Sequence, residues 1–393
     1  MRRVRGRLAV SALSFVAVAV VVRVAVVPPE RCPSPSVQER RAAAAAAVGW
    51  LARNQETDGT WLYQYDAGAD EISSDYNLVR HAGVTLSLYQ AAGVGLDRAE
   101  RVADRGADYA RDHLVDGEPA EFAAFGFPGA RLETGATALL TAALLERRAV
   151  TGDRSDDRLL ARLGNFLVGQ VRDDGAVLSL WDPQTRAPVP DHYDRFATGE
   201  ALWALARLHR AFPEAGWDEP ARQVARYVAT DRDRDERRFP YLSDHWSAYA
   251  FDEMARWPGN RLDEPEIEYA RRQAGIHGVQ VRYESQRRDG GVTELVRGPY
   301  APGSGLGTLG EGIGALGRLA AVDARLDDVA SDLADRAECV SGMLVDRQVT
   351  AAEAQSMAQP DLARGAWFHR DLTRMDDQQH AISALLVAQD PAQ

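Results

Sequence analysis

The chain has 393 residues, 45% hydrophobic and 26% charged, which is the balance of a globular protein with a large core. Its formal net charge of −12 argues against nucleic acid as a partner, because a surface that binds nucleic acid is basic. All 46 basic residues are arginine, so the chain has no Schiff-base lysine and no phosphate-loop lysine. This argues against pyridoxal enzymes, P-loop NTPases and protein kinases.

The N-terminus resembles a membrane-targeting segment. Residues 1–7 (MRRVRGR) form a basic flank that is expected to stay cytoplasmic, and residues 8–27 are apolar. Twenty helical residues span roughly 30 Å, the thickness of a bilayer core. We predict an uncleaved signal anchor that places a single-pass protein in the cell membrane, with its body outside the cytoplasm; secretion is less favoured. Residues 28–36 form a proline-rich spacer.

The two cysteines, Cys32 and Cys339, have no partner at CxxC spacing, so no structural zinc site based on cysteine is expected. A disulfide between them would need an oxidising compartment. The sequence favours two unpaired thiols over that disulfide.

The chain beyond residue 36 is helical by its hydrophobic period, and two kinds of helix alternate. Amphipathic, charged helices are predicted to begin near residues 37, 97, 155, 219, 264 and 325. Almost uncharged helices are predicted to begin near residues 76, 133, 197, 244, 308 and 377, and such helices are buried. Six outer helices around six inner ones predict an all-α fold, an (α/α)6 toroid that fills residues 37–393 as one domain. A solenoid of helix pairs is the main alternative.

Two connections carry a turn signature. Gln55 is followed by the turn of ETDGTW, and Gln170 by RDDGAVLSLWD; in both, Asp-Gly supplies a turn with positive φ. The charge run at 231–238 (DRDRDERR) is interpreted as a solvated loop.

With these turns, four blocks resemble a known architecture: YNLVRHAG, YDRFATGEALWALARLH, SDHWSAYAFDEM and TLGEGIGALGRLA. The chain from about residue 36 to 390 looks like the six-hairpin superfamily of glycoside hydrolases, polysaccharide lyases and sugar epimerases. The blocks are similar to a group of bacterial toroid proteins. The resemblance implies the toroid fold and does not specify one reaction.

The polar residues of the six apolar helices cluster at their N-terminal ends. Inner helices of a toroid run parallel, so these ends are expected to line one mouth. Caps and first-turn acids are ordinary features of helix starts. Such caps do not explain Arg80 and His81 inside an inner helix, so a functional cavity is the favoured interpretation.

Paired carboxylates, one protonated and one ionised, carry out glycoside hydrolysis. The candidates are Asp244, Glu311 and Glu200, where Asp244 precedes a histidine and a tryptophan, and Glu311 lies between two glycines. For lyase or epimerase chemistry, His81 or a tyrosine would be the base and Arg80 would hold a carboxylate with two hydrogen bonds. The predicted substrate-binding residues are Asn77, Arg80, Glu133, His245, Trp246, Tyr65 and Asp377. No cofactor and no metal are predicted, since no HExxH-like spacing occurs.

The sequence thus predicts a membrane-anchored, extracytoplasmic protein that hydrolyses, or else eliminates or epimerises, a cell-envelope or extracellular polysaccharide or oligosaccharide. A non-catalytic glycan-binding or scaffold toroid is one alternative. A terpene cyclase or prenyltransferase is another, but class II cyclases need an Asp-x-Asp-Asp acid and the chain offers only Asp376 and Asp377. Prenyltransferases need cysteine and histidine zinc ligands, and the position of Cys339 in a charged outer helix makes that match weak as well.

Overall fold

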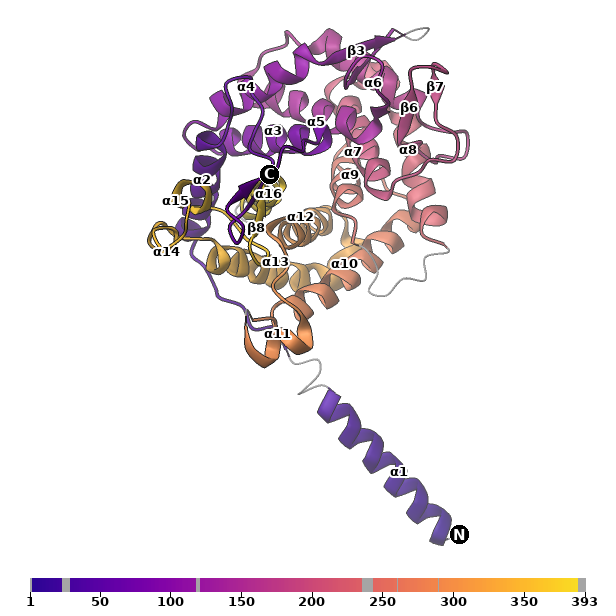
Figure 1. The fold of residues 1–393 in the computed structure, drawn as a ribbon. Coiled ribbons are helices and arrows are strands. Elements are labelled where there is room, and N and C mark those ends of the chain that lie inside the picture. Colours follow the sequence, from indigo (N-terminus) through magenta and orange to yellow (C-terminus); the bar gives the residue numbers. More distant parts are fainter. Residues whose placement is uncertain are drawn as a thin grey trace.

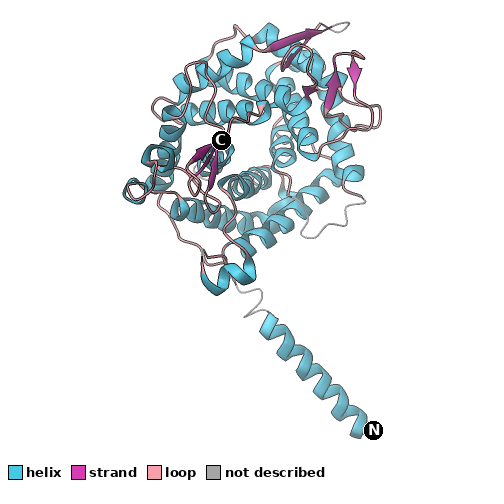
Figure 2. Cartoon of the chain, viewed as in Figure 1, coloured by secondary structure: helices cyan, strands magenta, loops and turns pink. Residues whose placement is uncertain are grey.

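The uncharged segment after Glu133 forms helix α5 (Thr134–Thr151), in which every residue from Thr134 to Leu145 is buried. A helix that is apolar on all sides needs packing partners on all sides. The computed structural model supplies them by placing α5 in an inner ring of helices that an outer ring surrounds (Figures 1 and 2). It describes residues 2–22, 29–117, 121–234, 243–259, 261–288 and 290–387.

Each inner helix packs against the next, and the last returns to the first, so the ring closes. In chain order the inner helices are α3 (Leu78–Gly93), α5, α7 (Arg195–Ala211), α9 (His245–Ala255), α12 (Gly303–Ala320) and α16 (Met375–Val387). Contact between α16 and α3 rules out the open solenoid. The all-α toroid predicted from the helix pairs is therefore confirmed.

The outer helices are amphipathic and cover the ring: α2 (Val37–Arg53), α4 (Ala99–Asp112), α6 (Asp157–Gly169), α8 (Asp218–Tyr227), α10 (Glu264–Glu284) and α13 (Asp327–Arg347). Helix α4 shows the pattern, because it buries Val102, Ala103, Gly106, Ala107 and Ala110, three or four residues apart, against the inner ring. A π-helical turn, Val228–Arg232, extends α8. Short helices lie in the connections: α11 (Gly291–Arg297), α14 (Ala351–Ala354), α15 (Pro360–Ala363) and two 3-10 turns, Pro213–Ala215 and Ala324–Leu326.

Across the ranges that the structure describes, eight short strands form three small antiparallel sheets in the loops (Figure 2). One sheet joins β1 (Gln64–Asp66) to β2 (Glu71–Ile72) and β8 (Leu372–Arg374), and so ties the first repeat to the last. The others pair β3 (Leu114–Gly117) with β4 (Phe122–Phe125), and β6 (Leu180–Asp182) with β5 (Leu132–Glu133) and β7 (Ala187–Pro188).

The predicted glutamine turns form as hydrogen-bonded units. The side-chain amide of Gln55 donates to the Gly59 and Val102 carbonyl oxygens, and that of Gln170 to the Leu178 carbonyl oxygen. Gly59 has a φ of +96°, a conformation that favours glycine.

The N-terminal helix α1 (Arg2–Val21) covers part of the predicted membrane span, and residues 23–27 of that span lie outside the described residues. Among the helices that the structure describes, none is both long enough and apolar enough to cross a bilayer. The predicted transmembrane helix is therefore not supported by the described residues.

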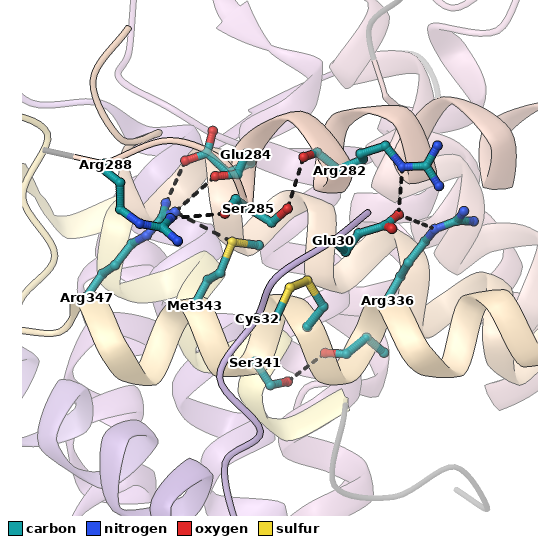
Figure 3. The surroundings of a disulfide bond; sticks show 12 residues. Glu30, Cys32, Arg282, Glu284, Ser285, Arg288, Arg336, Ser341, Met343 and Arg347 are labelled. Carbon is teal, nitrogen blue, oxygen red and sulfur yellow. Dashed lines mark hydrogen bonds and ion pairs between the residues drawn. A yellow bond between two sulfur atoms is a disulfide. The ribbon is translucent and has the colours of Figure 1, made fainter. Parts of the chain in front are cut away.

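The expectation of two unpaired thiols is wrong. Cys32 in the spacer forms a disulfide with Cys339 of α13, with 4.9 Å between their Cα atoms (Figure 3). Beside it, Glu30 Oε1 lies 3.3 Å from Arg282 Nε and 3.6 Å from Arg336 Nε. Ring closure brings α13 beside α2, and this pairs cysteines that are 307 residues apart. A contact at that separation leaves no local pattern in the sequence.

Replacing both cysteines with serine is expected to lower the free energy of unfolding by about 2–4 kcal/mol, because the cross-link restricts the unfolded chain. Urea denaturation of the variant and of the parent, with and without reductant, measures this difference. Reductant should destabilise the parent and leave the variant unchanged. Equal midpoints for all four samples would contradict the prediction.

Candidate active site

A cavity of about 760 Å³ opens where the N-terminal turns of the inner helices meet. Every inner helix, or the residue just before it, contributes polar lining: Asn77, Arg80, Glu133, Asp194, Glu200, His245, Ser304, Thr308, Asp376, Gln379 and His380. The six helix starts therefore share one mouth, as their clustered polar residues predict. Glycines in these helices allow the close approach; a side chain at Gly307 of α12, for example, would collide with the backbone of His380 in α16.

The predicted site residues divide into two groups. Those that line the cavity are Glu200, Asn77, Arg80, Glu133, His245 and Trp246. In the part of the chain that the structure describes, the residues that do not line it are Asp244, Glu311, His81, Tyr65 and Asp377.

His81 points away from the cavity, so its placement does not fit the predicted catalytic base. The imidazole is fully buried, with Nε2 2.8 Å from the Gly106 carbonyl oxygen and Nδ1 2.7 Å from the Tyr76 hydroxyl. Because a carbonyl oxygen only accepts, Nε2 carries the proton and Tyr76 donates to Nδ1. Burial lowers the pKa of His81 to about 4, which leaves a neutral ring that ties α3 to α4.

Asp244 is also structural rather than exposed to substrate. It caps α9, and its buried carboxylate accepts hydrogen bonds from Ser247 Oγ and Arg232 Nη1, both at 2.6 Å. Burial opposes ionisation, but Arg232 and Ser247 outweigh it and lower the pKa of Asp244. The predicted solvated charge run is thus wrong for Arg232 and Asp233, whose side chains are only 7% and 12% exposed, and it holds for the exposed Asp231 and Arg234; residues 235–238 lie outside the described residues.

Tyr65 and Asp377 hold local structure. Tyr65 is buried and its hydroxyl donates to Asp70 Oδ1 over 3.0 Å. Asp377 Oδ1 accepts from the backbone N–H and hydroxyl of Ser304, both at 2.8 Å, and Oδ2 accepts from the Arg374 N–H at 2.9 Å. Asp377 thereby fixes the start of α16 against the start of α12.

Glu311 acts on the cavity through His380. Its Oε2 lies 2.6 Å from His380 Nδ1, and its Oε1 accepts a hydrogen bond from the Tyr249 hydroxyl at 3.3 Å. Burial alone would lower the pKa of His380, but the Glu311 carboxylate beside it raises that pKa above its ordinary value. The ion pair therefore favours the cationic form of His380, which can act as an acid toward the cavity, while burial raises the pKa of Glu311.

His245 faces His380 and has the opposite character. The two ring centroids are 5.2 Å apart, and the rings are nearly perpendicular at 84°. Burial, with repulsion from His380, lowers the pKa of His245 well below its ordinary value, so its ring is neutral. Within the described structure, His245 Nε2 is buried and has no hydrogen-bond partner. Two imidazoles whose surroundings separate their pKa values form an acid and a base in one site.

A second acidic group lines the wall on the α5 and α7 side. Glu200 is almost completely buried, and burial raises its pKa to about 8, with further contributions from Asp194, Asp244 and Glu133. Burial and Asp194 also raise the pKa of Glu133. Glu200 therefore carries a proton at neutral pH and offers a second acid to a bound ligand.

On the wall formed by α3 and α16, Arg80 Nε forms an ion pair with Asp376 Oδ2 at 3.1 Å, and its guanidinium lies 5.2 Å from the Tyr63 ring centroid. Asn77 caps α3 by accepting from the Arg80 N–H at 2.9 Å. Arg80 is thus already paired with a carboxylate of the protein itself.

The prediction from sequence missed His380, Asp376 and Asp194 as site residues. His380 and Asp376 belong to DDQQH, which opens the last apolar helix, and this cluster was the signal that pointed to them. Asp194 accepts hydrogen bonds from the Phe196 and Ala197 N–H groups, so it has the pattern of an ordinary cap.

In the described residues, the cavity region contains one group that could hold a metal ion, although the sequence predicts none. The group consists of His245, Glu311 and His380, whose ligand atoms lie within 4.8 Å of one another. Two imidazoles and a carboxylate are a set that Zn²⁺ or Fe²⁺ accepts. A metal here would displace the hydrogen bond between Glu311 and His380. The absence of a metal stays a prediction.

Known structures share this fold over nearly the whole chain. A cellobiose 2-epimerase from Spirochaeta thermophila superposes with a TM-score of 0.59 at 14% identity, over 90% of this chain and 97% of that one. An unsaturated glucuronyl hydrolase specific for heparin gives 0.58 at 12%, over 90% and 97%. A type II terpene cyclase from Scytonema gives 0.51 at 14%, over 89% and 98%.

No family model and no curated protein matches the sequence. At these identities the likeness establishes the six-hairpin toroid fold that the sequence blocks implied, and it leaves the reaction to be argued from the site.

Proposed function

We propose that the protein is a carbohydrate-active enzyme that moves a proton at a sugar carbon, with His245 and His380 as the base and acid. The observation that carries the proposal is the contact between two imidazoles in the lining of a polar cavity, where the surroundings lower the pKa of His245 and raise that of His380. Similarity of the fold to a cellobiose 2-epimerase supports a sugar as the substrate. Sequence reasoning favoured hydrolysis, and the geometry favours proton transfer.

The reaction starts from an open-chain sugar whose carbonyl is next to a C–H bond. Neutral His245 removes that proton, the C–H electron pair forms an enediolate, and the carbonyl oxygen takes the negative charge. Because the two rings are in contact and reach the carbon from one side, the enediolate must turn its other face toward them before the second proton transfer. Protonation of the same carbon by His380 then regenerates the carbonyl and inverts the carbon. Glu311 keeps His380 charged for this step.

Exchange with solvent deuterium tests the proposal directly. A panel of reducing disaccharides and oligosaccharides, incubated with the full chain in D2O, is expected to gain deuterium at the carbon next to the carbonyl, as measured by NMR. His209→Gln, a change at the opposite end of α7 where the ring packs on Trp257, should retain the exchange. No deuterium in any sugar of the panel would overturn the proposal.

Hydrolysis is the second candidate, and protonated Glu200 near Asp194 and Glu133 is the observation that favours it. In this case the same panel would release new reducing ends, and Glu200→Gln would stop that release. Binding without either product would instead identify a non-catalytic glycan-binding toroid. Apolar side chains such as Val79, Leu139 and Phe196 also line the cavity, but a terpene would leave its many polar groups without partners, so a saccharide is favoured.

The same proposal places the protein at the cell membrane, with the toroid on the extracytoplasmic side and an envelope or extracellular saccharide as its substrate. The disulfide supports an oxidising compartment (Figure 3). Large apolar side chains of α1, such as Leu13, Phe15 and Val18, are exposed, which supports a membrane contact. Extraction of membranes with carbonate tests the anchor, and release of the full chain would contradict it.

A further inference from the structure

We infer that an aromatic groove beside the main cavity binds the remainder of an oligosaccharide whose reacting end lies at the two histidines. This inference rests on the proposed function and deepens it, because it makes the substrate a chain rather than a single sugar. The groove has a volume of about 410 Å³. It lies over the loop before α3, the end of α4 and the turn after β4.

The groove adjoins the main cavity at Tyr63. Tyr63 lines both of them, and its hydroxyl accepts a hydrogen bond from Arg80 Nη1 on the cavity wall. From Tyr63 the rings follow one another outward, with 6.3 Å between the centroids of Tyr63 and Tyr76 and 6.3 Å between those of Tyr76 and Tyr109. A ligand can thus remain in contact with aromatic rings as it leaves the cavity.

The outer end of the row is exposed. Tyr109 stacks on His113 with 4.1 Å between centroids, and His113 meets the edge of Phe127 at 5.2 Å. Phe127 is 43% exposed, and Ile72 on the other side of the groove is 60% exposed. Core packing explains buried rings such as Trp61, but it does not explain large apolar groups left facing water around a groove.

The chemistry of the groove fits a saccharide chain. The faces of a pyranose ring carry C–H groups that pack on aromatic rings, while its hydroxyls need polar partners at the edges. Ser73, Ser74 and Asp75 supply hydroxyl and carboxylate groups along one edge, and Glu56 and Thr60 lie nearby. An entirely apolar ligand would leave these groups without partners.

Calorimetric binding of cello-oligosaccharides and manno-oligosaccharides, from disaccharide to hexasaccharide, tests the inference with the full chain. Affinity is expected to rise with chain length in the parent. The double variant Ile72→Ala/Phe127→Ala is expected to weaken binding of the hexasaccharide about three- to tenfold and to leave disaccharide binding unchanged. Both side chains are exposed, so the fold should tolerate the changes.

Val322→Ala is the matched control, because Val322 is 51% exposed and follows the end of α12 opposite the cavity. It should bind every ligand as the parent does. Affinity that does not depend on chain length, or an equal loss for short and long ligands in the groove variant, would overturn the groove and leave the proposed function standing. No binding of any oligosaccharide would overturn both.

Discussion

Replacing His245 or His380 with alanine is expected to lower kcat by about 10²–10⁴-fold, the usual contribution of a positioned acid or base. The two losses should not add, because each histidine completes the same proton transfer. Solvent deuterium exchange measures both variants. External imidazole should restore part of the exchange in the His245→Ala variant, because that change opens space at the cavity wall. A structural role would give no such rescue.

The pH dependence of kcat/KM distinguishes the base, His245, from the acid, His380. His245 has a lowered pKa and must be neutral, so activity should persist below the ordinary histidine value of 6.5 before it falls in acid. His380 has a raised pKa and must be charged, so activity should fall in alkali only above that value. The expected profile is a bell with a wide plateau around neutral pH.

Glu311→Gln tests the positioning role of the carboxylate. Without the negative charge beside it, His380 loses its proton at lower pH, so the alkaline limb of the bell should move toward acid while the acid limb stays in place. Thermal unfolding of the variant checks that the fold survives. An alkaline limb that does not move would show that Glu311 does not control the charge of His380.

The fold was predictable because the distribution of apolar residues along each helix shows which of its faces are buried. Helix α5 is apolar on every face, whereas α4 is apolar along one stripe only. Each helix can therefore be assigned to the inner or the outer ring from its own sequence. The closed ring and the shared mouth follow from six such pairs.

The rotation of each inner helix about its own axis could not be predicted from the sequence. Consecutive residues point about 100° apart, so at most some of the polar residues in a first turn can face the cavity. His245 lines the cavity whereas Asp244 does not, and Arg80 lines it whereas His81 does not. Asp244 and His81 are held away from the cavity by hydrogen bonds to Arg232 and to the Gly106 carbonyl oxygen. These partners lie on the outer ring, so the sequence around Asp244 and His81 does not reveal them.

Asp244→Asn is expected to lower the free energy of unfolding by about 1–3 kcal/mol, because the Arg232 guanidinium loses one of its two carboxylate partners and keeps the other, Asp233. Asparagine still caps a helix well, so the loss reports the ion pair rather than the start of α9. Urea denaturation measures it, with Asp194→Asn, an exposed cap of α7, as the control that should change stability by less than about 1 kcal/mol.

Arg232→Met should destabilise the protein more, by about 3–5 kcal/mol, because it leaves the buried Asp244 carboxylate without its cation, and adding Asp244→Asn should recover part of that loss. Since Asp244 does not line the cavity in the described structure, exchange activity per folded molecule should survive Asp244→Asn. If the variant were as stable as the parent but had no activity, Asp244 would be a catalytic carboxylate, as the sequence predicts. Loss of stability with activity retained would instead establish that this carboxylate anchors the wall on which His245 stands.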